Sequence, residues 1–100
     1  MKEPFSFDRG RVALSIQGRD RGRYFIVLEN LGNGYVTLAD GDTRRLAKPK
    51  KKKTMHLRAK PLLLDLSSLR PEGGPLQDSD LRKALRENGF AEERSLSREG

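Results

Sequence analysis

After the first ten residues, apolar positions recur at intervals that predict short β-strands. Residues 11–16 are apolar at every second position, which is the period of a strand with one buried face. Residues 23–30 are apolar on both faces, so we expect a strand that is buried on both sides. A third strand is predicted at 35–40. Turns rich in Gly and Asn, at 18–22 and 30–34, separate the three strands.

The next part of the chain predicts a hairpin and a last short strand. Asp40–Asp42 has the composition of a tight hairpin loop, so we expect residues 43–47 to form the returning strand and 54–58 to form another. Four or five strands at such short intervals are typical of a small barrel or sandwich. No connection is long enough for a crossover helix. Because a barrel removes exposed sheet edges, we predict an all-β core, closed as a small barrel, over residues 9–58.

The segments outside this core differ from it in composition. Residues 1–8 are predicted to be a lead-in, and residues 91–100 a disordered tail. Residues 59–77 combine several leucines with Pro and a Gly-Gly pair. We expect a leucine-containing segment that covers an edge or end of the barrel, followed by a linker.

A short C-terminal helix is predicted within residues 78–90. Asp78 or Ser79 can cap its start, and Gly89 fits the position after its end. Its narrow apolar stripe consists of Leu81, Ala84 and Leu85. An isolated helix of this length is unstable in water, so it must dock on the barrel, dock on a partner or fray.

Composition limits both the size of the core and the chemistry of the protein. The chain has 100 residues, of which 34% are hydrophobic and 35% charged. This fits a compact unit of about 50 to 60 residues. The absence of cysteine excludes disulfides, thiolate metal sites and thiol catalysis.

No apolar run approaches the roughly 20 residues of a membrane span, and the N-terminus lacks the apolar region of a signal peptide. We therefore expect a soluble, cytoplasmic protein.

Positive charge is concentrated in one segment of the chain. Residues 44–60 hold nine Lys or Arg and no carboxylate, whereas the whole chain has a formal net charge of +7. Such a cluster repels itself unless a polyanion neutralises it. Nucleic acid is favoured because each phosphate contact releases condensed counterions.

Runs of lysine are often only solvated arms. The length of the run in this chain, its lack of acidic residues and the presence of Pro49 favour a binding site. We expect Lys50–Lys53 to act as an arm whose replacement by Ala leaves the fold intact.

A second basic element lies between the first two predicted strands. Gly18 and Gly22 allow a sharp loop that brings backbone N–H groups close to a phosphate, although turn geometry alone also explains both residues. If the loop is extended, its three arginines share one face and can bind phosphate oxygens through their guanidinium forks. The expected RNA-binding cations of the chain are Arg19, Arg21, Arg23, Arg44, Arg45, Lys48, Lys50, Lys51, Lys52, Lys53 and Arg58.

Few aromatic residues accompany these cations. Tyr24, Phe25 and Tyr35 are the aromatics nearest to them in sequence, and in a domain this small we expect all three to serve the core. Without a stacking platform, recognition of structured RNA by shape and phosphate contacts is favoured over the reading of single-stranded bases.

The sequence contains no combination of residues that is typical of a catalytic site. His56 is the single histidine and has no neighbouring Cys or carboxylate partner in sequence. Asp40 and Asp42 are more simply explained by a hairpin loop than by paired catalytic carboxylates. The chain contains no P-loop or dinucleotide fingerprint. We expect no enzymatic activity, no metal, no cofactor, no small-molecule substrate and no membrane partner.

Gly10-Arg11-Val12, followed by Gly18–Arg23 and a hydrophobic strand, resembles the KOW motif. This motif occurs in large-subunit ribosomal proteins and in elongation factors of the NusG type. The stretch ADGDTRRLAKPKKKKTMHL looks like that of small bacterial KOW-domain RNA-binding proteins, which are similar to KOW-domain ribosomal proteins of the archaeal and eukaryotic large subunit. The resemblance covers about Arg9 to Arg58. It implies an SH3-like barrel with motif glycines Gly10, Gly18 and Gly22, and binding to RNA, often ribosomal RNA.

The sequence therefore predicts an RNA-binding protein, ribosomal or ribosome-associated, with ribosomal RNA as its expected partner and ribosomal proteins as its neighbours. The alternative is a protein-interaction adaptor of the NusG kind, in which the barrel and the apolar stripe of the C-terminal helix bind a partner and the lysines only aid solubility. A weaker option is non-specific DNA binding.

Overall fold

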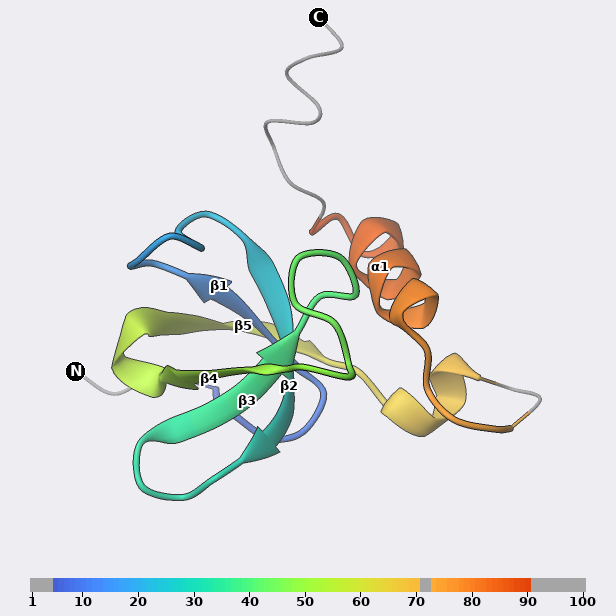
Figure 1. Cartoon of the computed structure of the whole chain (residues 1–100), viewed down its shortest axis with the longest axis horizontal. Coiled ribbons are helices and arrows are strands. Elements are labelled where there is room, and N and C mark those ends of the chain that lie inside the picture. Colours follow the sequence, from blue (N-terminus) through green and yellow to red (C-terminus); the bar gives the residue numbers. More distant parts are fainter. Residues whose placement is uncertain (1–4, 71–72, 91–100) are drawn as a thin grey trace, which may run out of the picture.

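In the computed structural model, which describes residues 5–70 and 73–90, five strands form one antiparallel sheet with the order β4-β3-β2-β1-β5 (Figure 1). The predicted tail at 91–100 lies outside the described residues, as do residues 1–4 and 71–72. The elements are β1 (Arg11–Ser15), β2 (Tyr24–Asn30), β3 (Tyr35–Ala39), β4 (Lys50–Lys53), the 3₁₀ turn η1 (Thr54–His56), β5 (Leu57–Leu63), the 3₁₀ turn η2 (Leu66–Leu69) and helix α1 (Asp78–Glu87). The expected β core with one short helix is confirmed.

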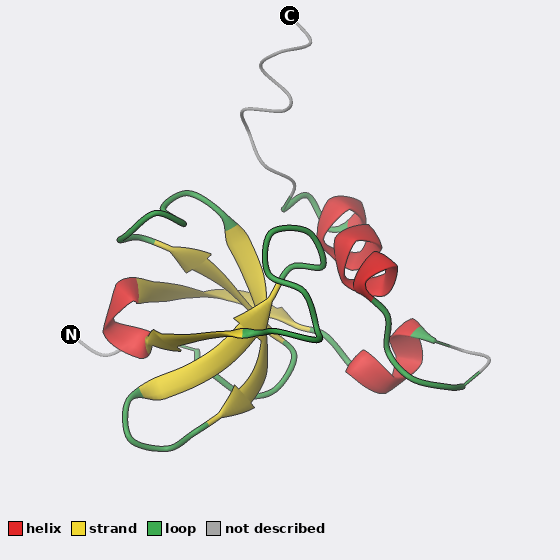
Figure 2. Cartoon of the chain, viewed as in Figure 1, coloured by secondary structure: helices red, strands yellow, loops and turns green. Residues whose placement is uncertain are grey.

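Both faces of the sheet are covered by apolar side chains. An inner cluster consists of Ala13, Phe25, Val27, Val36, Leu38 and Leu57. A helix-side cluster consists of Val12, Ile26 and Ala39 with Leu66, Leu81 and Leu85. The prediction that the first strand buries only one face is therefore wrong, because Ala13 (0% exposed) and Ser15 (1%) are buried as well. The second layer, visible beside the sheet in Figure 2, is supplied by α1 and η2.

Helix α1 docks on the sheet through its predicted apolar stripe, of which Leu81 is fully buried. It ends as expected before Gly89, whose φ is +83°. Its start differs from the prediction, because Gln77 is the N-cap and donates its N–H to the Asp80 carboxylate at 2.8 Å. Asp78 instead accepts the N–H of Leu46 at 2.8 Å. No helix in the described part of the chain has the length and apolar character needed to cross a membrane.

The returning strand is the lysine tract, not residues 43–47. Residues 40–49 form a loop, and β4 then pairs with β3 so that Lys52 lies opposite Val36. The buried Asp40 carboxylate accepts the N–H groups of Asp42 and Arg44, and this curls the chain where a tight hairpin was expected. The expectation that Lys50–Lys53 form an arm is also wrong, because these residues are a strand of the sheet.

The last strand is longer than the predicted 54–58. Residues 54–56 form η1, and β5 then continues to Leu63, so that it crosses the boundary expected at residue 58. Gly10, with φ of +97°, lets this segment approach closely. A Cβ at Gly10 would lie 2.0 Å from the carbonyl oxygen of Leu64, whose N–H donates to the Gly10 carbonyl at 2.8 Å. The leucines after β5 pack on the helix-side cluster.

Candidate nucleic-acid interface

The lysine tract forms an edge strand, and its four side chains occupy different environments. Because side chains alternate along a strand, neighbouring lysines point to opposite faces of β4. Lys51 and Lys53 are exposed, Lys50 is half-buried, and Lys52 is buried with 8% of its surface exposed. Three of the four lysines are therefore accessible to a ligand.

Lys52 is a structural residue. Its ammonium donates to the Ser15 hydroxyl at 3.0 Å and to the Gln17 carbonyl oxygen at 2.9 Å, and it lies 3.6 Å from a carboxylate oxygen of Asp20. Two hydrogen bonds and one ion pair therefore hold this ammonium within the protein. The expectation that Lys52 contacts phosphate is therefore corrected, because its ammonium is turned into the protein.

Asp20 lies in the loop of residues 18–23 between β1 and β2, here called the arginine loop, and connects it to Lys52 of β4 and to Arg44 of the loop that precedes β4. Asp20 is 7% exposed, and its carboxylate lies 3.5 Å from the Arg44 guanidinium and 3.6 Å from the Lys52 ammonium. Sequence reasoning missed this residue. The signal was present, however, since Asp20 is a single acid placed between two arginines in the loop GRDRGR.

The arginine loop is folded into turns. The N–H of Arg21 donates to the Gly18 carbonyl at 3.2 Å, and the N–H of Arg23 donates to the Asp20 carbonyl at 3.0 Å. The loop is therefore not extended, which was the condition for three arginines on one face. Arg19 and Arg21 are exposed, whereas Arg23 is half-buried.

The motif glycines of this loop have the backbone conformation that its turns require. Gly18 and Gly22 have φ of +89° and +90°, which side-chain-bearing residues rarely adopt. Turn geometry thus accounts for both residues, and their contact with phosphate stays a prediction.

A recess of about 320 Å³ lies against β4. It is lined by Gln17, Gly18, Tyr35, Lys50, Lys51, Lys52, Lys53 and His56, with no carboxylate among them. The Lys51 ammonium lies 4.9 Å from the centroid of the Tyr35 ring, within the range of a cation–π contact. Gln17 and Tyr35 had not been identified as site residues from the sequence.

The three aromatics expected in the core have different positions. Phe25 is fully buried in the inner cluster. Tyr24 packs on the helix-side cluster, where its ring centroid is 5.0 Å from that of Phe90. Tyr35 belongs to neither cluster and is half-buried. The prediction that all three serve the core is therefore wrong for Tyr35.

The remaining expected cations are spread over two places. Arg45 and Lys48 are exposed on the loop before β4, close in sequence to the tract. Arg58 is exposed on β5, the strand at the other end of the sheet order. The sheet order does not place Arg58 beside β4, so we do not include it with the cations of the recess.

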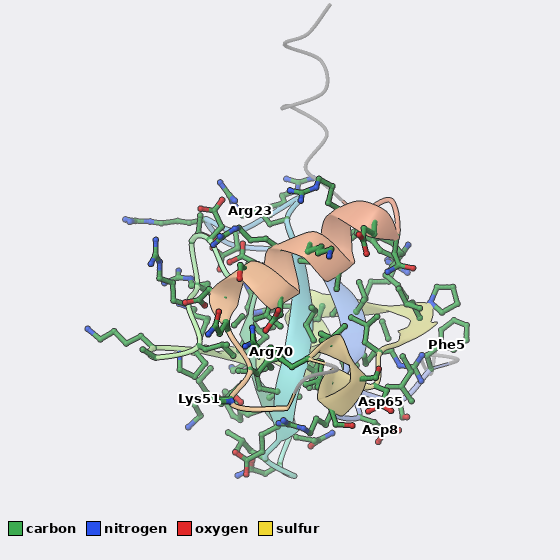
Figure 3. All side chains as sticks on the ribbon, turned by 90° about the vertical axis from the view of Figure 1, so that its right-hand side faces the viewer. Phe5, Asp8, Arg23, Lys51, Asp65 and Arg70 are labelled. Atoms are coloured by element: carbon green, nitrogen blue, oxygen red, sulfur yellow. The ribbon has the colours of Figure 1, made fainter. Side chains whose placement is uncertain are left out.

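The carboxylates Asp8 and Asp65 lie away from Arg23 and from Lys51 of β4 (Figure 3). Figure 3 places Arg23 and Lys51 on one side, and Asp8 and Asp65 on the other. The pKa of Asp65 is lowered, mainly because its carboxylate accepts the hydroxyl and the N–H of Ser67.

Within residues 5–70 and 73–90, no group of His, Cys, Asp or Glu is arranged to hold a metal ion.

No protein-family model matches this chain, and no curated protein matches it significantly. Its function is therefore inferred from the charge and geometry of β4, the arginine loop and the recess between them.

Proposed function

We propose that this protein binds structured RNA through a basic surface made of β4, the arginine loop and the loop that precedes β4. The observation that supports the proposal most directly is the edge strand β4, in which Lys51 and Lys53 are exposed with no carboxylate lining the adjacent recess. The accessible cations of the basic surface are Arg19, Arg21, Arg45, Lys48, Lys50, Lys51 and Lys53.

We also propose that the strands close as an SH3-like barrel of the KOW kind. The order β4-β3-β2-β1-β5 and the short 3₁₀ turn η1 between β4 and β5 support this fold. The KOW resemblance makes ribosomal RNA the first target to test, with ribosomal proteins as neighbours in the assembly.

Phosphate contacts supply most of the affinity in this proposal. Lysine ammonium groups are point charges on flexible stems, and they contact the phosphate backbone without reading base sequence. Specificity then comes from the shape of the RNA. The protein acts by binding, with no catalytic step.

Protection of the sheet edge is the simplest competing explanation for the lysines. Charged side chains on an edge strand prevent its pairing with a second sheet. Positive and negative charges both serve this purpose. RNA binding requires positive charge. The two explanations are therefore separated by reversing the charge at β4, which keeps the edge protected.

The charge-reversal test compares two variants of equal net charge. In Lys51→Glu/Lys53→Glu the exposed lysines of β4 are reversed, and in Lys83→Glu/Arg86→Glu two exposed cations of α1 are reversed. We expect the β4 variant to lose about tenfold or more in affinity for all structured RNAs alike, measured by fluorescence anisotropy with a labelled RNA hairpin. We expect the α1 variant to bind almost as the unchanged protein does. Equal losses in the two variants would show that only net charge matters, and would contradict the proposed surface.

Of the two binding elements expected for the adaptor alternative, the barrel and the apolar stripe of the C-terminal helix, the stripe is covered. Leu81 and Leu85, the apolar stripe assigned to a partner protein, are buried against the sheet. A partner cannot reach this stripe while α1 is docked.

A further inference from the structure

The recess beside β4 combines an available aromatic ring with cations. We propose that it binds one unpaired nucleotide of the RNA, with the base stacked on Tyr35 and a phosphate held by Lys50, Lys51 or Lys53. This inference rests on the proposed RNA binding and adds a base-contacting position that the sequence had not indicated.

Tyr35 is placed for contact with a ligand. It is the first residue of β3, it is half-buried, and it belongs to neither core cluster. Its ring is in contact with the Lys51 ammonium at 4.9 Å. Tyr24 and Phe25, the other aromatics near the cations in sequence, are engaged in the two clusters. Tyr35 is therefore the aromatic of this region that an RNA base can reach.

A base can replace Lys51 on this ring. An exposed cation–π contact is weak, whereas unpaired bases of RNA stack readily on aromatic side chains. The displaced ammonium remains next to the ring, on a flexible stem, and can then pair with the phosphate of the stacked nucleotide.

The charges around the recess favour an anion. Lys50 and Lys53 line it, and neither side chain has a hydrogen bond or ion pair with any described residue. The Lys52 ammonium donates to Ser15 and Gln17 and is ion-paired with Asp20, so it is engaged within the protein and is not assigned a contact with the ligand. Asp20, the acid that contacts Lys52, is also paired with Arg44.

The size and polar groups of the recess fit a single nucleotide. Its volume of about 320 Å³ is at the lower end of the range for small-molecule sites, which is suitable for one extruded residue and far too small for a helix. The Gln17 side-chain amide offers both donors and an acceptor for the edge of a base. A free phosphate would use the lysines but would leave Tyr35 and Gln17 without a role.

The test uses the unchanged protein and two RNA hairpins. One hairpin carries a single bulged adenosine, and the other carries an abasic residue at the same position. Since stacking on an aromatic residue contributes substantially to affinity, we expect the adenosine hairpin to bind about fivefold tighter or more. Tyr35→Leu should abolish this difference, and Tyr35→Phe, which keeps the ring, should retain it.

Fluorescence gives an independent measurement. The chain has two tyrosines and no tryptophan, so in Tyr24→Phe the emission comes from Tyr35 alone. We expect the adenosine hairpin to quench it and the abasic hairpin to leave it nearly unchanged. Equal affinity for both hairpins, with a steep salt dependence, would overturn the nucleotide site while RNA binding stands. Failure of both hairpins to bind would overturn the proposed function and this inference together.

Discussion

At the residue scale, the ion pairs of Asp20 with the buried Lys52 and the half-buried Arg44 link the arginine loop to β4. Asp20 comes from the arginine loop, whereas Lys52 comes from β4 and Arg44 from the loop that precedes β4. Burying an ammonium is costly unless it is paired and hydrogen-bonded. The ion cluster thus fixes the position of the arginine loop relative to the exposed lysines.

This arrangement predicts a large effect of Asp20→Ala on stability. The substitution leaves the Lys52 ammonium buried without its carboxylate, so we expect the free energy of unfolding to fall by about 3 kcal/mol. Lys51→Ala removes a neighbouring but exposed lysine, and we expect a change within about 0.5 kcal/mol. Urea unfolding followed by circular dichroism measures both. Near-equal effects would mean that Lys52 is not anchored by Asp20.

At the element scale, periodicity predicted the parts of the fold that depend on local sequence. The first three strands and α1 follow from apolar spacing and turn residues, and the structure contains all four. β4 was missed because lysine is depleted in strands, while its pairing with Val36 and Leu38 of β3 is a tertiary contact. The second buried face of β1 was also missed, because Ala13 is small, Ser15 is polar, and the side chains that cover Ala13 come from β2, β3 and β5.

The docking of α1 can be tested through its stripe. Leu81 is 0% exposed in the helix-side cluster, so Leu81→Ala should lower the free energy of unfolding by about 2–5 kcal/mol. Lys83→Ala, on the exposed face of the same helix, should have little effect. Thermal or urea unfolding of both variants checks this. A negligible effect of Leu81→Ala would indicate that the helix frays or needs a partner.

At the scale of the whole molecule, the C-terminal segment covers one face of the sheet and leaves the basic edge open. Helix α1 and turn η2 lie beside the sheet, away from the exposed lysines of β4 (Figure 1). The sequence predicted the cationic segment because its charges are contiguous. It did not predict the recess, since Gln17, Tyr35 and His56 come together only when β1, β3 and β4 are assembled. The candidate site therefore depends on the tertiary structure as well as on the contiguous charges.

The salt dependence of RNA binding by the full chain tests the central claim most directly. If about five cations of the basic surface contact phosphates, a plot of log affinity against log salt concentration should have a slope of about −4 or steeper. The measurement requires one labelled RNA hairpin and a series of salt concentrations. A slope near about −1 would contradict the account, because it would leave most of these cations without a phosphate partner.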